Sequence, residues 1–207
     1  MAEKEDKAAL RKAYLVRRAA ISRADRARAA QMAASILFDV RALNLLPRFY
    51  TFAAYLSVGA EFPTEAVLQA LFQAQAAVCV PRFSDVQRGY AWASLAPGVP
   101  MRQGPHRIPE PETSERFPAG YVDAVLVPGV AFDICGGRLG YGAGIYDRLL
   151  AGLRQNSLRV GMAFDCQVRR EPLPQELHDE QMDYLVTETQ WIDCRLARSL
   201  KRRRGHG

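Results

Sequence analysis

The hydrophobic positions of the chain alternate between segments of helical spacing and short, nearly continuous apolar runs. Residues 6–21 are rich in Ala, Leu, Lys and Arg and lack Gly and Pro, which favours a helix. Ser22 with Asp25 three positions later is typical of a helix N-cap followed by an acid in the first turn, so a second helix is predicted to run to about Phe38. Further helices are predicted around residues 67–72, 145–153 and 191–200.

The apolar runs are typical of buried strands. Residues 49–56 are apolar at nearly every position, as in a strand covered on both faces. A second strand is predicted over residues 77–80, ending before Pro81, and others over residues 122–127, 160–164 and 184–186. Because strands alternate with helices, this order favours an α/β sandwich of three layers, with a parallel or mixed sheet between helices. Ligands of such sheets bind beyond the carboxyl ends of the strands, so functional residues are expected just after each strand.

Length and composition fit one compact domain. The chain has 207 residues, of which 49% are hydrophobic and 24% are charged, and these values exclude a disordered or fibrous protein. Residues 96–120 contain six prolines and are predicted to be a loop. We expect a single domain over residues 1–200 and a basic tail outside the fold over residues 201–207.

The net charge of +6 comes from the two ends of the chain. Residues 195–207 contain six basic residues and no acid, and residues 1–28 contain nine basic residues against four acids, so the body between them is mildly acidic. A protein that binds nucleic acid through its basic ends is therefore one alternative. The middle of the chain lacks the mixture of aromatic and basic residues that stacks bases, and we expect no nucleic-acid partner.

Cysteine spacing and hydropathy bear on the compartment. The four cysteines lie far apart, with no C-x-x-C pair and no histidine at zinc-finger spacing, so neither a metal knuckle nor a redox pair is indicated. No apolar run approaches the roughly 18 residues of a membrane span, and the N-terminus lacks the pattern of a secretory signal. We expect a cytoplasmic protein with reduced thiols and no membrane partner. Since no heptad or apolar seam is evident, we expect a monomer.

The most informative segment follows the predicted strand at residues 122–127. Glycines at positions 140, 142 and 144 precede a predicted helix, and their backbone N–H groups could approach phosphate oxygens. Arg138 and Arg148 could add bidentate contacts to such a site. The spacing fits neither the dinucleotide-binding G-x-G-x-x-G pattern nor the P-loop. On the residues alone, a structural turn and an anion-binding loop both remain open.

This segment resembles the signature of the 5-formyltetrahydrofolate cyclo-ligase family. The family pattern is P-G-[LV]-x-F-D, a short loop, and then R-[LI]-G-x-G-x-G-[YF]-Y-D. This chain has P-G-V-A-F-D over residues 128–133 and R-L-G-Y-G-A-G-I-Y-D over residues 138–147. Other blocks follow in the family's order at residues 7–11, 55–61, 108–111, 161–164 and 177–183. The resemblance therefore spans about residues 7–188, and it implies a mainly parallel, Rossmann-like sheet flanked by helices.

The resemblance implies an ATP-dependent ligase that requires Mg²⁺. The expected substrates are ATP and 5-formyltetrahydrofolate, with or without a polyglutamate tail. The formyl oxygen attacks the γ-phosphate, N10 of the folate attacks the carbon of the resulting imidoyl phosphate, and loss of phosphate leaves 5,10-methenyltetrahydrofolate. Such a reaction needs a cationic cradle for the triphosphate, carboxylates for Mg²⁺ and a pocket that presses the formyl group against the γ-phosphate.

The resemblance also implies roles for single residues outside the glycine-rich segment. Lys7 and Arg11 match an N-terminal basic pair that reaches nucleotide phosphate, whereas their spacing alone indicates only that they share one helix face. Glu61 matches an acid that binds the folate, and Leu56 matches an apolar contact beside it. Asp179 matches a metal-binding acid.

Within the glycine-rich segment, the resemblance implies an ATP-binding loop made of Arg138, Leu139, Gly140, Tyr141, Gly142, Ala143, Gly144, Ile145 and Tyr146. The part of this loop from position 141 to position 145 is also expected to border the folate. Asp147 matches a second metal-binding acid. Arg138, Tyr146 and Asp147 are the expected catalytic residues.

Three positions depart from the family's pattern. Tyr141 stands where many members carry Arg, Ile145 stands where Tyr or Phe is usual, and His106 stands in a segment where an aromatic residue is common. Loss of an aromatic face beside the folate weakens its binding or alters selectivity. An alternative therefore remains open, in which a member of the family binds folate or nucleotide without efficient turnover.

Overall fold

The computed structural model of the protein describes residues 6–39, 51–85, 88–113, 115–176 and 179–204. The predicted strand at residues 49–56 and the block at residues 177–183 lie partly outside these ranges.

Two capped helices open the chain, as the sequence predicts. α1 (Lys7–Ala19) begins after Asp6, whose carboxylate accepts hydrogen bonds from two backbone N–H groups of the first turn. α2 (Arg23–Phe38) begins after Ser22, whose side chain accepts a hydrogen bond from the backbone N–H of Asp25.

A sheet forms the centre of the fold. In the described part of the chain its seven strands have the order β12-β11-β9-β6-β1-β2-β3. The five inner strands run parallel: β11 (Tyr184–Val186), β9 (Leu158–Met162), β6 (Ala124–Val127), β1 (Thr51–Ala53) and β2 (Ala77–Ser84). Antiparallel strands form the two edges, β12 (Trp191–Asp193) and β3 (Gly89–Leu95). The prediction of an α/β fold with a mainly parallel sheet is confirmed.

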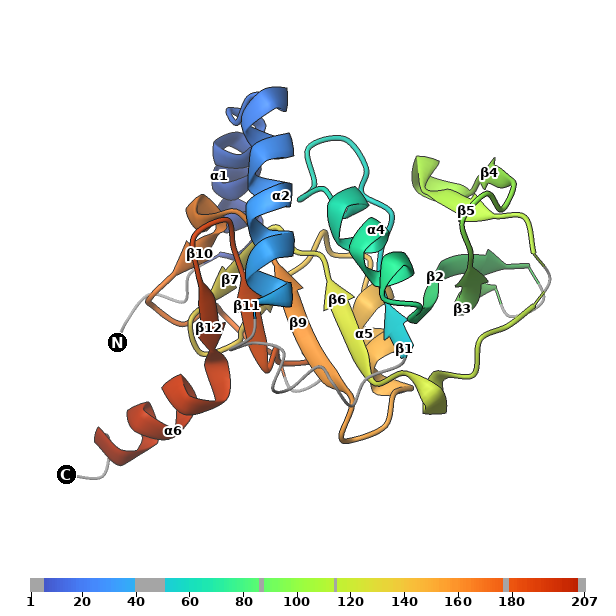
Figure 1. The fold of residues 1–207 in the computed structure, drawn as a ribbon. Coiled ribbons are helices and arrows are strands. Elements are labelled where there is room, and N and C mark those ends of the chain that lie inside the picture. The colour runs from blue at the N-terminus through green and yellow to red at the C-terminus, as the bar shows by residue number, and fades with distance from the viewer. Residues whose placement is uncertain (1–5, 40–50, 86–87, 114, 177–178, 205–207) are drawn as a thin grey trace.

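Successive residues of each strand face opposite sides of the sheet and build two cores (Figure 1). On one face, Phe52 and Leu126 pack with α2 and with α4 (Glu65–Gln73). On the other face, Val125 packs with α5 (Ile145–Ala151). The result is three layers, with α2 and α4 on one side of the sheet and α5 on the other.

A second, small sheet carries the glycine-rich segment. It consists of β10 (Val168–Arg169), β7 (Ala131–Asp133) and β8 (Arg138–Leu139). α1 covers it, because Tyr14 packs on Val130, Ala131, Leu139 and Leu173 in a third apolar cluster. α1 also packs against the 3₁₀ turn η3 (Asp165–Gln167). Strands of two or three residues carry too little periodic signal to be predicted.

The predictions for residues 77–120 need correction. β2 does not end before Pro81 but continues to Ser84, which is possible because the pairing with β1 ends at Cys79 and the missing N–H of Pro81 interrupts no parallel ladder. The predicted loop at residues 96–120 contains a hairpin of β4 (Met101–Gln103) and β5 (Pro109–Pro111), with the 3₁₀ turns η1 (Pro105–Arg107) and η2 (Ala119–Tyr121).

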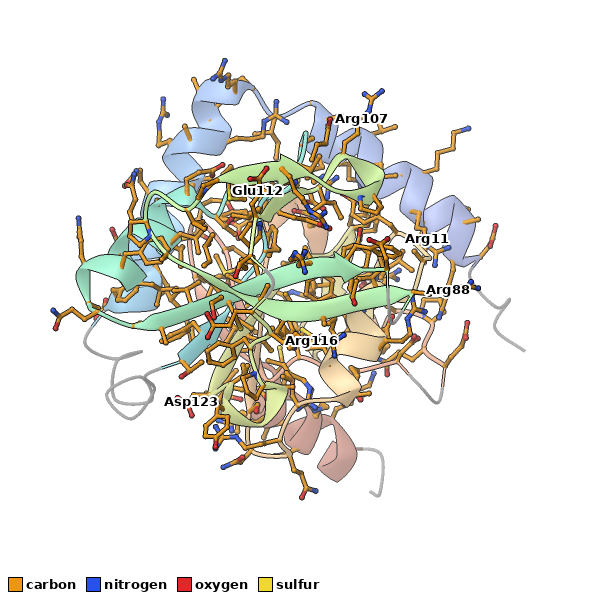
Figure 2. All side chains as sticks on the ribbon, turned by 90° about the vertical axis from the view of Figure 1, so that its right-hand side faces the viewer. Arg11, Arg88, Arg107, Glu112, Arg116 and Asp123 are labelled. Atoms are coloured by element: carbon orange, nitrogen blue, oxygen red, sulfur yellow. The ribbon has the colours of Figure 1, made fainter. Side chains whose placement is uncertain are left out.

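Figure 2 faces the edge of the sheet formed by β3, which the sequence analysis did not predict. Arg88 lies at the end of the β2–β3 hairpin, and Arg116 makes an isolated bridge with Ala93 on the outer side of β3. The segment after the β4–β5 hairpin thus covers part of an edge that would otherwise expose unpaired backbone groups.

The predicted helix at residues 191–200 is divided in the structure. Trp191–Asp193 form β12, because pairing with β11 overrides local helix preference, and α6 (Cys194–Arg204) follows. Residues 201–204 belong to the helix α6, which extends away from the body in Figure 1. Among the described residues, no helix is long and apolar enough to cross a membrane.

Candidate active site

A cavity of about 580 Å³ opens beyond the carboxyl ends of β1 and β6. These neighbouring strands mark the point where the strand order reverses, since β2 follows β1 to one side and β9 and β11 follow β6 to the other. Open α/β sheets bind ligands at this point. Every site residue implied by the sequence resemblance lines the cavity, whereas Arg148 lies outside the lining and donates to the backbone oxygen of Ala143.

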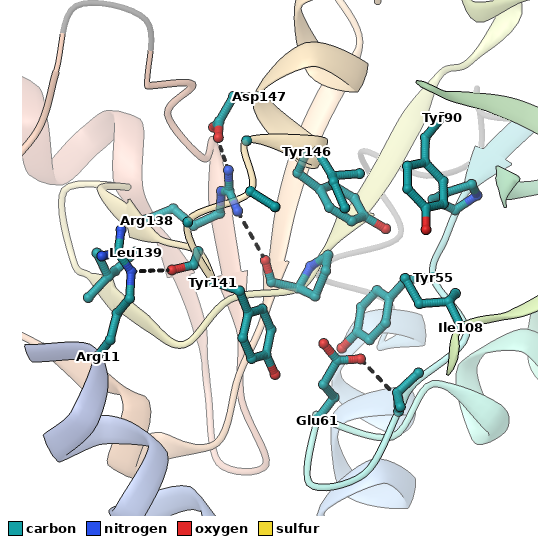
Figure 3. A pocket seen from close by; sticks show the side chains of 18 of the residues that line it. Arg11, Tyr55, Glu61, Tyr90, Ile108, Arg138, Leu139, Tyr141, Tyr146 and Asp147 are labelled. Atoms are coloured by element: carbon teal, nitrogen blue, oxygen red, sulfur yellow. Dashed lines mark hydrogen bonds and ion pairs between the residues drawn. The ribbon is translucent and has the colours of Figure 1, made fainter. Parts of the chain in front are cut away.

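One end of the cavity is basic (Figure 3). The side chain of Arg138 is 6% exposed, is paired with Asp147, and lies over the ring of Tyr146 at 6.0 Å from its centroid. Arg11 of α1 donates from Nε to the backbone oxygen of Gly140 over 2.8 Å, which ties α1 to the glycine-rich loop. Two arginines thus converge on one loop.

Lys7 adds a third cation at the same end. Its Nζ lies 2.9 Å from the carboxylate of Asp179 and 3.0 Å from that of Glu176. Partial burial lowers the pKa of Lys7, but the hydrogen bonds to these two acids outweigh burial and hold the pKa above its ordinary value. Lys7 is therefore a charged ammonium group at the cavity wall.

The loop between β8 and α5 depends on glycine. Gly142 and Gly144 have φ angles of 103° and 63°, in the left-handed region that side chains other than glycine rarely adopt. Ala143 between them is not among the residues with a positive φ, so its side chain causes no backbone strain. The loop can therefore expose successive backbone groups to the cavity.

The other end of the cavity combines one carboxylate with aromatic walls (Figure 3). Glu61 accepts a 2.9 Å hydrogen bond from the backbone N–H of Val58. Burial raises the pKa of Glu61, and this N–H, the charge of Arg18 and the hydroxyl of Tyr141 oppose that rise. Tyr55, Tyr90 and Tyr146 also line this end.

Tyr146 contributes an unpaired hydroxyl to the aromatic end. Its ring packs edge-on against Trp92, with 6.5 Å between ring centroids. Its hydroxyl is buried and has no hydrogen-bond partner among the described residues. Burial, with the nearby charge of Glu61, raises the pKa of Tyr146 well above its ordinary value, so the group is a neutral donor.

The donor set suits a metal that is shared with a ligand. Among the residues described, no three His, Cys, Asp or Glu side chains gather in one place to hold a metal unaided. Asp147 and Asp179 both line the cavity, however, and Mg²⁺ is commonly held by one or two carboxylates together with phosphate oxygens and waters. These two acids therefore fit Mg²⁺ bound with a nucleotide.

Several lining or supporting residues escaped the sequence analysis. Arg18, Tyr55 and Tyr90 were not singled out, although Arg18 lies seven positions after Arg11 and so shares its helix face. Ile145, which stands where an aromatic residue was expected, lines the cavity and packs with the core around α5. The side chain of His106 lies outside the described part of the structure.

The chain is similar to known proteins in sequence and in fold. The chain is 35% identical over 144 residues to the 5-formyltetrahydrofolate cyclo-ligase of Haemophilus influenzae, covering 67% of this chain and 76% of that protein. It is 32% identical over 142 residues to the protein of the same name from Escherichia coli, covering 67% and 78%. The NMR structure of Aquifex aeolicus 5,10-methenyltetrahydrofolate synthetase superposes with a TM-score of 0.77 at 30% identity, covering 91% of this chain and 93% of that chain.

The sequence profile of one family extends over nearly the whole fold. It matches residues 3–188, from the start of the chain through β11, and so includes every residue that lines the cavity. The chain belongs to the 5-formyltetrahydrofolate cyclo-ligase family.

Proposed function

We propose that this protein catalyses the ATP-dependent cyclisation of 5-formyltetrahydrofolate, giving 5,10-methenyltetrahydrofolate, ADP and phosphate. The observation that carries the proposal is the division of one cavity into a basic end and an aromatic, acidic end. The family membership and the names of the relatives support the same reaction. The proposed enzyme acts as a monomer, on folate with or without a polyglutamate tail.

The basic end suits the triphosphate. Lys7, Arg11 and Arg138 place three positive charges around the loop of Gly140 to Gly144, whose backbone groups are open to the cavity. Phosphoryl transfer is catalysed chiefly by positioning and by neutralising charge on the phosphates, and this cluster supplies both. Arg138 is the strongest candidate for the transferred group, because its planar fork is held in place by Asp147 and by the ring of Tyr146.

Asp147 and Asp179 would hold Mg²⁺, which when bound supplies positive charge to the phosphate oxygens. Each acid is paired in the structure with a cation of the phosphate site, Asp147 with Arg138 and Asp179 with Lys7. Binding of the nucleotide with its metal would therefore exchange partners within the cluster, so that the cations turn to phosphate while these two acids turn to the metal.

The aromatic end suits the pterin ring of the folate. Glu61 can accept hydrogen bonds from ring N–H groups, while Leu56, Ile108 and Tyr90 supply apolar contact. The hydroxyl of Tyr146, which has no partner among the described residues, would donate to the bound ring. Tyr141 lies between the two ends, as expected for a residue that borders both substrates (Figure 3).

The chemistry then proceeds in two steps. The formyl oxygen on N5 attacks the γ-phosphorus, the bond to the bridging oxygen breaks, and ADP leaves with the electron pair. N10 next attacks the phosphorylated formyl carbon, the carbon–oxygen bond breaks to release phosphate, and the N10 proton is lost. Holding the formyl group against the γ-phosphate is the main contribution of the cavity, because the reaction gains its rate largely from proximity.

A coupled assay tests the proposal. Purified protein is mixed with 5-formyltetrahydrofolate, ATP and Mg²⁺, and the methenyl chromophore is followed together with ADP. We expect both products in equal amounts, none without Mg²⁺, and a loss of at least about a hundredfold in Asp147→Asn. Folate binding without either product would overturn the proposal and favour the alternative of a relative that binds without turnover.

A further inference from the structure

Arg18 is a buried cation beside the cavity that none of the roles above uses. It follows Lys7, Arg11 and Tyr14 at intervals of four, three and four residues, so α1 turns all four toward the body. Arg18 is only 4% exposed. A buried guanidinium is costly unless hydrogen bonds and an opposite charge compensate it.

The hydrogen bonds of Arg18 reach the segment after β6 and the glycine-rich loop. One terminal nitrogen donates to the backbone oxygen of Gly129 over 3.3 Å, and the other donates to the hydroxyl of Tyr141. Within the described chain, no carboxylate lies close enough to Arg18 for a direct ion pair. The carboxylate that feels its charge is Glu61, which also interacts with the hydroxyl of Tyr141.

The hydrogen bonds that link Arg18, Tyr141 and Glu61 run in one direction from donor to acceptor. A guanidinium group only donates hydrogen bonds, so the oxygen of Tyr141 accepts from Arg18. The single proton of that hydroxyl is then directed to another acceptor, and the carboxylate of Glu61 faces it (Figure 3). Arg18 therefore orders a chain that runs from α1 through the glycine-rich loop to the acid at the aromatic end.

We propose that Arg18 is a positioning residue that holds Tyr141 against Glu61 and keeps Glu61 as an ionised acceptor for the N–H groups of the bound folate ring. This inference rests on the proposed function, since it assigns a ligand to Glu61. It makes α1 part of both ends of the site, with Lys7 and Arg11 at the phosphates and Arg18 behind the folate acid.

The groups around Glu61 decide its charge. Burial raises its pKa, and the opposing influences in order of size are the Val58 N–H, Arg18 of α1 and Tyr141 of the loop. Tyr55 and Tyr146 face it from the end of β1 and from α5, and both have pKa values well above ordinary and stay neutral. Arg18 is thus the cation whose removal allows Glu61 to take up a proton at a higher pH.

The test compares Arg18→Met with Arg17→Met, which removes the same charge from the next, exposed position of α1. The KM for folate, the KM for ATP and kcat are measured across about pH 5–8, and folate binding is titrated without ATP. We expect Arg18→Met to raise the folate KM and dissociation constant about tenfold, as for loss of one charge-assisted hydrogen bond, with kcat and the ATP KM nearly unchanged. The acid limb of kcat/KM for folate should move to higher pH, and Arg17→Met should match the wild type.

Tyr141→Phe separates positioning from simple loss of packing. It leaves Arg18 in place but removes the hydroxyl, so we expect a smaller shift of the acid limb in the same direction. The double variant should resemble Arg18→Met, because both changes interrupt one chain. Additive effects, an unmoved acid limb in Tyr141→Phe, or an effect on ATP in place of folate would overturn the assignment. If Arg18→Met fails to fold, the acid limb of Tyr141→Phe tests the assignment by itself. If no turnover occurs, the dissociation constants for folate, titrated without ATP, test it.

Discussion

Tyr146→Phe removes a buried hydroxyl that the folded, ligand-free protein does not use. The hydroxyl has no partner among the described residues, and its ring stays packed against Trp92. Burying an unpaired hydroxyl costs about 1–3 kcal/mol in protein mutational data. We therefore expect the variant to be more stable by about 1 kcal/mol, since loss of the oxygen's packing offsets part of that gain. For a chain of this length that change corresponds to a rise of roughly 2–4 °C in Tm.

The same change should damage the site. The hydroxyl faces the aromatic end of the cavity and remains protonated because burial raises its pKa, so in the proposed enzyme it would donate a hydrogen bond to the folate. Loss of one hydrogen bond to a ligand, with the ligand's acceptor left buried, lowers kcat/KM by about 10- to 100-fold. A substitution that raises stability while lowering activity is the signature of a group held unpaired for its ligand.

Tyr55→Phe is the matched control. The hydroxyl of Tyr55 is also buried at the cavity wall, but it donates to the backbone oxygen of Phe62 over 2.8 Å. Its removal leaves that buried oxygen without its partner and should lower stability by about 1–3 kcal/mol. Urea unfolding and steady-state kinetics of the two variants are compared side by side. Equal destabilisation of both, or full activity in Tyr146→Phe, would refute the reasoning.

Three further outcomes follow from the same structure. Burial raises the pKa of Glu61 above 4.5, so the contribution of Glu61 to stability is fully present below the unfolded pKa and is lost as the pH rises through the folded pKa. At pH 7, Glu61→Gln should therefore unfold at a urea concentration no lower than that of the wild type, and it should bind folate more weakly. A less stable variant would contradict this sign. Burial raises the pKa of Cys79 and of Cys194 to about 12, so thiol titration of the folded protein should label the exposed Cys166 well before these two, which should react only in denaturant. Gly144→Ala places a side chain at a φ of 63° and should cost about 1 kcal/mol of stability and a larger factor in the ATP KM, whereas Gly152→Ala, at a φ of −83°, should change neither.

The sequence predicted the elements whose patterns are local. α1, α2, α4 and α5 and most strands of the large sheet coincide with periodic or continuous apolar segments, because burial on one or two faces leaves that pattern in any chain that folds this way. β12 was wrongly assigned to a helix because pairing with β11, distant in sequence, decides its conformation. β7, β8 and β10 exist only as partners of one another and left no periodic signal.

In the site, too, local features could be predicted from the sequence and contacts between distant segments could not. The glycine-rich loop could be located from sequence because its residues are contiguous and their backbone demands restrict composition. Arg18, Tyr55 and Tyr90 could not, since each becomes part of the site only when α1, the end of β1 and β3 meet around the cavity. The spacing that places Arg18 on the face of Lys7 and Arg11 is visible in the sequence, but an exposed basic helix face has the same spacing. Contact with Gly129 and Tyr141 separates the two interpretations.

The attachment of α1 explains why the basic end can exist before a nucleotide arrives. Its apolar contact with the body centres on Tyr14, while Lys7 reaches two acids of the site and Arg11 reaches a backbone oxygen of the glycine-rich loop. Those acids and oxygens would hold the cations apart from one another in the absence of phosphate, and a bound triphosphate would replace them as the partner. In the proposed enzyme, nucleotide binding would thus strengthen the contacts between α1 and the glycine-rich loop. By linkage, a nucleotide that binds better when α1 is docked stabilises that docking. The N-terminal helix therefore forms a wall of the cavity, with Lys7, Arg11 and Arg18 on the face toward the body and Lys12 and Arg17 exposed on the other side.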